Sequence, residues 1–191
     1  MLATDVTGGI LAGGRGLRMG GRDKGLIELR GKTLVELTCA RLRPQVSALL
    51  ISANRNLDRY RELGFPVHAD NSSGFLGPLA GIATLLAMVQ TPYLVTVPCD
   101  TPEFPFDLVS ALRARQIESG ADVVVTHDGE QRQFLFALYR RELAEQAERA
   151  LATGERAVWR WHEKLEVAEC AFPGAAQAFA NVNSEADIGP G

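Results

Sequence analysis

The sequence contains little of what marks a secreted, membrane-bound or disulfide-stapled protein. Its three cysteines, Cys39, Cys99 and Cys170, are far apart and form no CxxC pair. This argues against a disulfide framework or a structural zinc site and fits a reducing compartment. No apolar run approaches the roughly 18 residues of a membrane span, and the first residues lack the pattern of a secretory signal. We therefore expect a cytoplasmic protein with no membrane partner.

An excess of positive charge is also missing. The 191 residues hold 20 Lys and Arg against 23 Asp and Glu, which gives a net charge of −3. Such a chain lacks the broad positive field of a protein whose main partner is nucleic acid. Residues 15–32 are the exception, because they contain six basic and two acidic groups. A local positive spot in an acidic chain favours a small anionic ligand, although a solvated basic loop would have the same charge.

The apolar pattern alternates between two kinds of segment. Short apolar runs predict strands at residues 6–12, 46–53, 66–69, 93–97, 122–126, 134–139 and 167–172. Amphipathic stretches predict helices at residues 33–43, 57–63, 78–89, 106–119, 141–152 and 157–164. Strands separated by helices predict an α/β fold with a mostly parallel sheet and helices on both faces. Ligands of such sheets bind beyond the carboxyl ends of the strands.

The segment 11–25, directly after the first predicted strand, is rich in glycine. It contains six glycines, together with Arg18 and Lys24. Glycines let the backbone approach a ligand closely, and the N–H groups of such a loop can hold phosphate oxygens. The dinucleotide fingerprint fails because Met19 stands where its last glycine should be, and a P-loop fails because Leu26 stands where its first glycine should be. The segment therefore predicts a phosphate site of another kind.

Two aspartates and two asparagines follow predicted strands or lie on an extended segment. Asp100 comes after the buried strand 93–97 and is flanked by prolines, a place that suits a Mg²⁺ ligand. Asp70 ends the strand 66–69 and is either a ligand contact or a plain turn former. Asn181 and Asn183 point to one face if the segment is extended, although asparagines are also common in turns.

Several motifs together carry a resemblance to a known family. Residues 11–25 read Leu-Ala-Gly-Gly-x-Gly-x-Arg-Met-Gly-x-x-Asp-Lys-Gly, which resembles the nucleotidyltransferases related to molybdenum cofactor guanylyltransferase. Further matches cover nearly the whole chain: Gly31-Lys-Thr-Leu34, Ser52-Ala-Asn-Arg55, His68-Ala-Asp70, Gly77-Pro-Leu-Ala-Gly81, Pro98-Cys-Asp-Thr-Pro102, Gly154-Glu-Arg156 and Asn181-Val-Asn183. Sugar-phosphate nucleotidyltransferases share the first loop. The Pro98-Cys-Asp-Thr-Pro102 and Asn181-Val-Asn183 motifs together favour the molybdopterin branch.

The resemblance implies a three-layer Rossmann-like nucleotidyltransferase fold and assigns roles to individual residues. The implied catalytic residues are Arg18, Lys24 and Asp100, with Asp100 as the ligand of Mg²⁺, or of Mn²⁺ in its place. The implied nucleotide-binding residues are Leu11, Ala12, Gly13, Gly14, Gly16, Lys24, Ser52, Asp70 and Asp100. The implied pterin contacts are Arg156, Asn181 and Asn183. The chain departs from the family at Ser52, where many members have asparagine, and at Phe134, where many have proline.

The implied activity is transfer of GMP from GTP to molybdopterin or its molybdenum form. Molybdenum-insertion proteins and molybdoenzyme chaperones are the implied transient partners. We expect one domain over 1–191, with a nucleotide-binding half over about 1–126 and a smaller pterin half over about 127–191. A cytidylyl or sugar-phosphate nucleotidyltransferase is the alternative enzyme, but cytidylyl members more often read Leu-Ala-Ala-Gly than Leu11-Ala-Gly-Gly14. A GTP-binding switch would lack its P-loop, and a pterin carrier without turnover would have no need of Arg18, Lys24 and Asp100.

Overall fold

The computed structural model describes residues 3–13, 23–70 and 77–182. The predictions for Gly14, Gly16, Arg18 and Asn183 therefore lie outside the described residues. Within the described part, no helix is long and apolar enough to cross a membrane.

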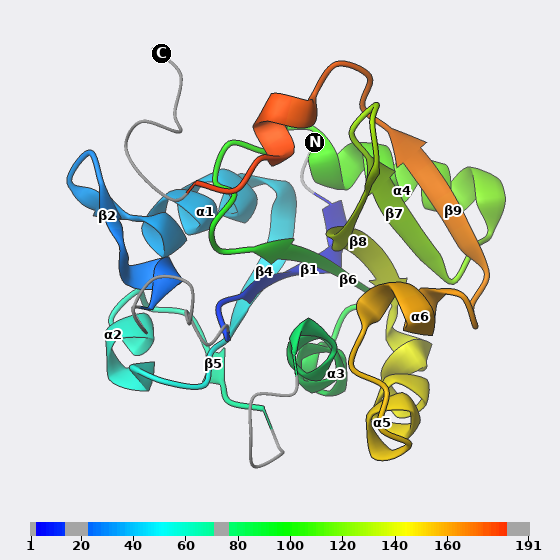
Figure 1. Ribbon diagram of the computed structural model, residues 1–191, viewed down its shortest axis with the longest axis horizontal. Coiled ribbons are helices and arrows are strands. Elements are labelled where there is room, and N and C mark those ends of the chain that lie inside the picture. The colour runs from blue at the N-terminus through cyan, green and yellow to red at the C-terminus, as the bar shows by residue number, and fades with distance from the viewer. Residues whose placement is uncertain (1–2, 14–22, 71–76, 183–191) are drawn as a thin grey trace.

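A seven-stranded sheet forms the middle layer, in the order β5-β4-β1-β6-β8-β7-β9 (Figure 1). Its strands are β1 (Ala3–Leu11), β4 (Val46–Ser52), β5 (Val67–His68), β6 (Tyr93–Pro98), β7 (Val123–His127), β8 (Arg132–Arg140) and β9 (Val167–Ala171). Strand β8 is antiparallel to both of its neighbours, whereas the other pairs in the sheet are parallel. The prediction of a mostly parallel sheet is confirmed.

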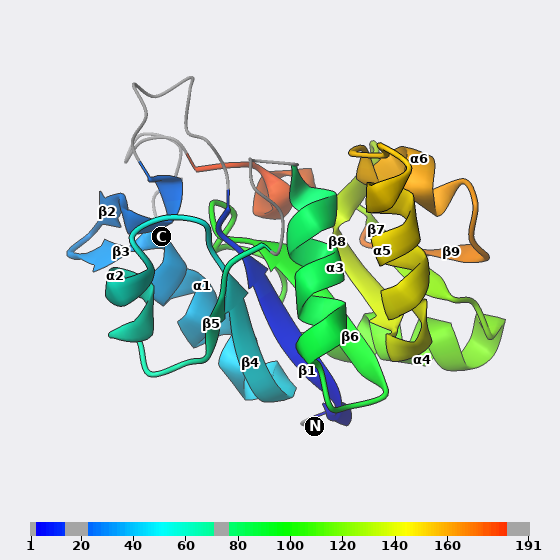
Figure 2. The same ribbon diagram turned by 90° about the horizontal axis from the view of Figure 1, so that it is seen from below.

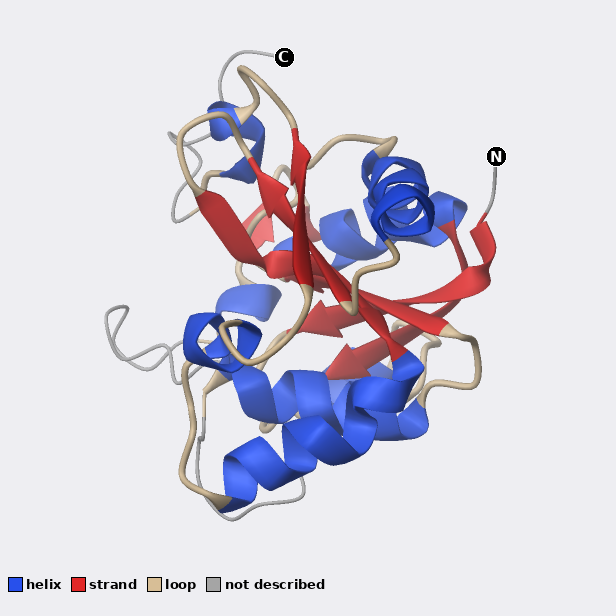
Figure 3. Cartoon of the chain, turned by 90° about the vertical axis from the view of Figure 1, so that its right-hand side faces the viewer, coloured by secondary structure: helices blue, strands red, loops and turns tan. Residues whose placement is uncertain are grey.

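Helices cover both faces of this sheet, as predicted (Figures 2 and 3). On one face α1 (Leu34–Leu42) and α4 (Leu108–Ser119) bury Leu42 and Leu112 against the sheet, next to α2 (Leu57–Arg61). On the other face lie α3 (Pro78–Met88), α5 (Ala144–Ala152) and α6 (Val158–His162). Short 3₁₀ helices complete the chain at η2 (Lys24–Leu26), η3 (Arg43–Gln45), η4 (Arg141–Leu143) and η5 (Ala176–Phe179). Three layers result.

Two glycines in the central strand β1 let the helices of both faces approach it closely. A Cβ on Gly8 would lie 2.8 Å from Leu42 Cδ2 of α1, and a Cβ on Gly9 would lie 2.7 Å from Leu85 Cδ1 of α3. These are closer than carbon atoms normally come, so a larger residue would displace the Leu42 or the Leu85 side chain. The glycines thus let these leucines pack directly on the strand that leads into the phosphate segment.

The structure adds a small element that the apolar pattern did not predict. Strands β2 (Glu28–Leu29) and β3 (Lys32–Thr33) form a separate antiparallel hairpin around the turn at Arg30 and Gly31, both of which have positive φ. Leu29 packs with Leu34 of α1 and Val182 near the end of the described chain. The hairpin therefore ties η2 and α1 to the segment that carries Asn181.

Candidate functional site

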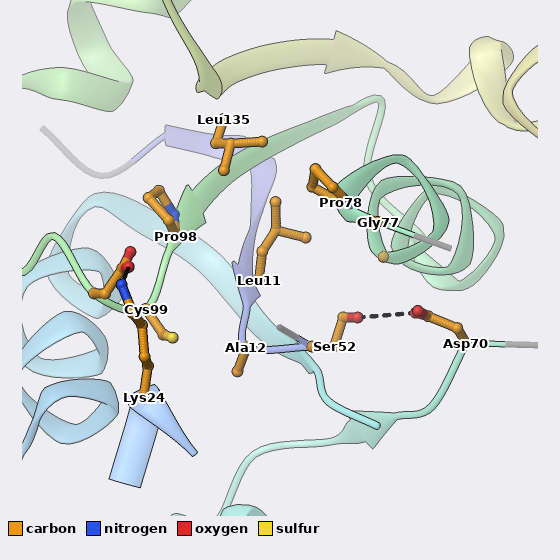
Figure 4. Close-up of a pocket in the computed structure, with 13 residues that line it drawn as sticks. Leu11, Ala12, Lys24, Ser52, Asp70, Gly77, Pro78, Pro98, Cys99 and Leu135 are labelled. Atoms are coloured by element: carbon orange, nitrogen blue, oxygen red, sulfur yellow. Dashed lines mark hydrogen bonds and ion pairs between the residues drawn. The ribbon is translucent and has the colours of Figure 1, made fainter. Parts of the chain in front are cut away.

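A cavity of about 370 Å³ opens at the carboxyl ends of β1, β4 and β6 (Figure 4). The residues that line it are Leu11, Ala12, Gly13, Lys24, Ser52, Asp70, Gly77, Pro78, Gly81, Pro98, Cys99, Asp100 and Leu135. Every nucleotide-binding residue predicted from the sequence and described by the structure is among them. The strand register brings them together, because Leu11 pairs with Ser52 on one side and with Pro98 on the other.

Asp100 and Lys24 meet on one wall of the cavity. Lys24 Nζ lies 3.0 Å from Asp100 Oδ2, and the two side chains are 29% and 15% exposed. Asp100 follows the end of β6, where the Cys99 amide donates to the Leu11 carbonyl at 3.1 Å. From the other side the Val182 amide donates to the Asp100 carbonyl at 2.7 Å. The backbone on either side of the carboxylate is therefore held by two different segments.

The position of Lys24 is set by its sequence neighbours Asp23 and Gly25. The Tyr60 hydroxyl donates to Asp23 Oδ1 at 2.6 Å and the Asn56 amide donates to Asp23 Oδ2 at 3.0 Å. Burial raises the pKa of the Tyr60 phenol, so the hydroxyl keeps its proton and acts as a donor. A Cβ on Gly25 would collide with the same hydroxyl. Asp23 and Gly25 together anchor η2 against α2 and leave Lys24 directed at the cavity.

Asp70 and Ser52 form the opposite wall, and Asn54 supports Asp70 from outside the cavity. The Ser52 hydroxyl donates to Asp70 Oδ1 at 3.2 Å, and the Asn54 amide donates to Asp70 Oδ2 at 2.7 Å. The backbone amide of Asp70 in turn donates to Asn54 Oδ1 at 2.9 Å. Each carboxylate oxygen can accept a further bond on its remaining lone pairs. The group is therefore fixed in orientation and still able to bind donors of a ligand.

The amino end of α3 closes the third side. Gly77, with φ of 84°, precedes Pro78 at the first turn of the helix. A Cβ on Gly81, one turn further, would lie 2.8 Å from the Ser52 hydroxyl oxygen. Glycine is thus required at position 77 by its backbone and at position 81 by the close approach of β4. The unpaired backbone N–H groups of a helix start favour an anionic ligand nearby.

The predicted pterin residues lie beside the cavity but do not line it. Asn181 Oδ1 accepts from the Thr101 hydroxyl at 3.0 Å, next to Asp100. Arg156 belongs to the α5–α6 connection, and its carbonyl oxygen would lie 3.4 Å from a Cβ on Gly77. Arg156 Nη1 donates to the Leu151 and Glu155 carbonyls at 2.8 and 2.6 Å. The structure therefore brings the two residues to the rim of the site, with the guanidinium bound to backbone.

Three residues that support the site were not predicted as functional, namely Asp23, Asn54 and Tyr60. Tyr60 and Asn54 are remote in sequence from Asp23 and Asp70, the residues that they bond, so no local pattern could have identified these two pairs. Asn54 did carry a signal, because it lies two residues beyond Ser52 just after the strand β4. Polar residues at that end of a parallel strand lie close to the ligand site.

A metal ion would find one carboxylate here rather than a full protein cage. No group of three or more His, Cys, Asp or Glu side chains that could hold a metal occurs among the described residues. Mg²⁺ in phosphate sites typically takes one or two carboxylates and completes its shell with phosphates and waters. Asp100, which already attracts the cationic Lys24 at 3.0 Å, fits this pattern.

Cys99 lines the cavity without the properties of a nucleophile. Its thiol is buried, and burial, reinforced by the neighbouring Asp100 charge, raises its pKa well above the usual range. Only the thiolate is nucleophilic. Cys39 and Cys170 are also buried and unbridged, so all three cysteines serve as packing residues.

Comparisons with known proteins give a consistent result. Residues 8–167 match the family model described as MobA-like NTP transferase domain. A molybdenum cofactor guanylyltransferase of Shewanella putrefaciens is 45% identical over 175 residues, which cover 92% of this chain and 90% of that protein. The crystal structure of molybdopterin-guanine dinucleotide biosynthesis protein A from Archaeoglobus fulgidus superposes with a TM-score of 0.75 at 23% identity, covering 95% of this chain and 94% of that one. A manganese complex of a Mycobacterium tuberculosis protein superposes with a TM-score of 0.67 at 20% identity, covering 90% of each chain.

Proposed function

The chain belongs to the MobA-like NTP transferase family, and we propose from this premise that it transfers GMP from GTP to molybdopterin. The products are molybdopterin guanine dinucleotide and pyrophosphate. The observation that carries the proposal is the cavity, in which the predicted triphosphate residue Lys24 and the predicted base residue Asp70 face one another across the ends of β1 and β4. Molybdopterin in its molybdenum form would serve as the same acceptor.

The reaction needs positioning and charge rather than a protein nucleophile. A terminal phosphate oxygen of molybdopterin attacks the α-phosphorus of GTP, a new P–O bond forms, and the bond to the β-phosphate oxygen breaks. Lys24 contributes a positive charge next to the triphosphate, and Gly13 lets the backbone approach it. Asp70 accepts from the guanine edge. Holding both reactants in line lowers the barrier by removing the entropy of their encounter, and Lys24 stabilises the charge that grows on pyrophosphate.

Asp100 would hold Mg²⁺ or Mn²⁺ together with the nucleotide phosphates. The bound ion neutralises phosphate charge in the ground state and in the transition state. A solved protein of the same fold is a manganese complex, which supports a divalent ion in this architecture. We propose Mg²⁺ and Mn²⁺ as alternative ions at this site.

The second substrate would bind at the rim that carries Asn181 and Arg156, and Asn183 is proposed as a further contact. Asn181 lies next to Asp100 through Thr101, so a phosphate brought there is close to the metal-binding carboxylate. The half of the chain over about 127–191 would supply the rest of the pterin surface. Molybdenum-insertion proteins and molybdoenzyme chaperones would be the transient partners, and the cytoplasm the compartment.

Nucleotide selectivity tests the proposal directly. GTP with Mg²⁺ should raise the melting temperature more than CTP, UTP or ATP with Mg²⁺. Ligand at 100 times Kd adds about 2.7 kcal/mol, which corresponds to roughly 5–10 °C for a domain of this size. The same protein should release pyrophosphate from GTP when molybdopterin is added. A larger shift with CTP would reassign the enzyme as a cytidylyltransferase, and GTP binding without turnover would point to a switch or carrier.

A further inference from the structure

Asn54 is bound to Asp70 from outside the cavity. Ser52 and Asp70 line the cavity, whereas Asn54 is not among the lining residues. Its amide donates to Asp70 Oδ2 at 2.7 Å, and its carbonyl oxygen accepts from the Asp70 backbone amide at 2.9 Å. Two bonds of opposite sense between one side chain and one residue fix both the carboxylate and the backbone that carries it.

We propose that Asn54 is a positioning residue that sets the preference for guanine over adenine by fixing the plane of the Asp70 carboxylate. This rests on the proposed function, in which Asp70 binds the base of GTP. Asn54 itself does not need to touch the nucleotide. Its effect passes through Asp70.

The selectivity follows from the donors and acceptors of the two purines. Guanine presents two neighbouring donors, N1–H and the N2 amino group, and a carboxylate in the plane of the base can accept from both. Adenine has an acceptor at N1, which a carboxylate repels. The discrimination therefore depends on orientation, because a carboxylate free to rotate loses one of its two bonds to guanine. A site built to bind donors rejects a ligand that lacks them more strongly than an apolar pocket can.

Ser52 is the weaker of the two supports. Its hydroxyl reaches Asp70 Oδ1 at 3.2 Å, which is longer than the Asn54 bond and forms no reciprocal link to the backbone. If the Ser52 hydroxyl rotated away, the bond from Asn54 would still hold the second oxygen of the Asp70 carboxylate in place. Ser52 is accordingly the matched control for a change at Asn54.

Asn54 also has a plain packing role that the experiment must separate. A Cβ on Gly13 would lie 3.0 Å from Asn54 Nδ2, so the side chain packs under the start of the phosphate segment. Loss of that packing would weaken the binding of every nucleoside triphosphate equally. Loss of the Asp70 orientation would weaken GTP alone. The ratio of the two affinities distinguishes these effects.

The test measures Kd for GTP and for ATP, each with Mg²⁺, by titration calorimetry on the full chain. In Asn54→Ala the GTP affinity should fall about tenfold and the ATP affinity should stay within about twofold, so that the GTP-to-ATP preference falls about tenfold. Ser52→Ala should reduce this preference by no more than about threefold. With molybdopterin, Asn54→Ala should raise KM for GTP and leave kcat within about twofold.

Two further variants keep the inference open to refutation. Asn54→Leu keeps about the same size but lacks both the donor and the acceptor, and it should lose the same preference without adding a charge next to Asp70. Adding Asn54→Ala to Asp70→Asn should cost no further selectivity, since Asn54 acts through that carboxylate. Equal losses for GTP and ATP, or an unchanged ratio in both Asn54 variants, would overturn the inference. A wild-type protein with no preference for GTP would instead overturn the proposed function.

Discussion

Polar side chains at the ends of β1, β4 and β6 have a different role from those around β7, β8 and β9. At the ends of β1, β4 and β6, Lys24, Asp70 and Asp100 line the cavity and are held there by groups from other elements. On the side of β7, β8 and β9, polar groups satisfy the fold itself. Asp128, for instance, accepts from the amides of Glu130 and Gln131 at 2.8 Å in the turn between β7 and β8.

The buried His162 is a second example of a polar side chain on the β7–β9 side that bonds within the protein. It is 3% exposed, packs against the Trp161 and Phe134 rings, and its Nε2 lies 3.0 Å from the Tyr139 hydroxyl. Burial lowers its pKa to about 4, so the ring is neutral at physiological pH. Lys24, Asp70 and Asp100 thus face the cavity, whereas Asp128 and the Nε2 of His162 bond within the protein. Variants should therefore affect activity on one side and stability on the other.

The largest effect is expected from Asp100→Asn. The change keeps the size of the side chain but removes the charge that would hold the metal, and kcat/KM should fall about a thousandfold. The free energy of unfolding should change by no more than about 1 kcal/mol, because the ion pair with Lys24 is partly exposed. Pyrophosphate release and thermal melting measure the two quantities. Near-normal turnover at limiting Mg²⁺ would show that Asp100 does not hold the metal.

A smaller loss of activity is expected from Lys24→Met. The variant keeps the bulk of the stem and lacks the ammonium group. If Lys24 contacts the triphosphate more strongly as charge builds on pyrophosphate, kcat should fall about a hundredfold and KM for GTP should rise as well. A rise in KM alone would mean that the contact is made equally in the ground state. Normal turnover with normal melting would show that the triphosphate binds elsewhere.

On the other side of the sheet, His162→Gln should change the pH dependence of stability and leave the chemistry in place. The pKa of His162 is about 6.5 in the unfolded chain and about 4 in the folded protein. Its contribution to the free energy of unfolding is therefore complete above pH 6.5 and is lost as the pH falls towards 4. The loss attributable to this group is up to about 3 kcal/mol. The variant should therefore show a flatter curve of unfolding free energy between pH 6.5 and 4.5. An identical slope in the two proteins would show that the buried ring does not govern this range.

The sequence was sufficient to predict the sheet, the two helical layers and several of the residues that line the cavity. Short apolar runs and amphipathic stretches carried the information on the fold. The family resemblance supplied most of the site residues, and Asp100 was also marked by its place after a buried strand. The direction of β8 was not predicted, because an apolar run does not encode strand direction. The four residues between β7 and β8 did hold a signal, since a parallel connection needs a dozen or more. The β2–β3 hairpin was missed because two-residue strands show no period.

The supports of the site were beyond prediction for a different reason. The Tyr60–Asp23 and Asn54–Asp70 bonds join residues 37 and 16 positions apart, and their geometry depends on how α2 and β5 pack beside β4. Sequence patterns identify groups that meet a ligand at a strand end. They do not identify which neighbours hold those groups still.

Strand β8 has a consequence for how the molecule unfolds. It lies between β6 and β7 in the sheet, contributes Leu135 to the cavity, and receives at the Leu135 carbonyl a hydrogen bond of 2.8 Å from the buried Thr96 hydroxyl. Neither side of the sheet can open without exposing an edge of this strand. We therefore expect the amides of β6, β8 and β7 to exchange their hydrogens in one common opening, which a hydrogen-exchange measurement would test. If the proposed function holds, nucleotide bound at the cavity should slow that exchange.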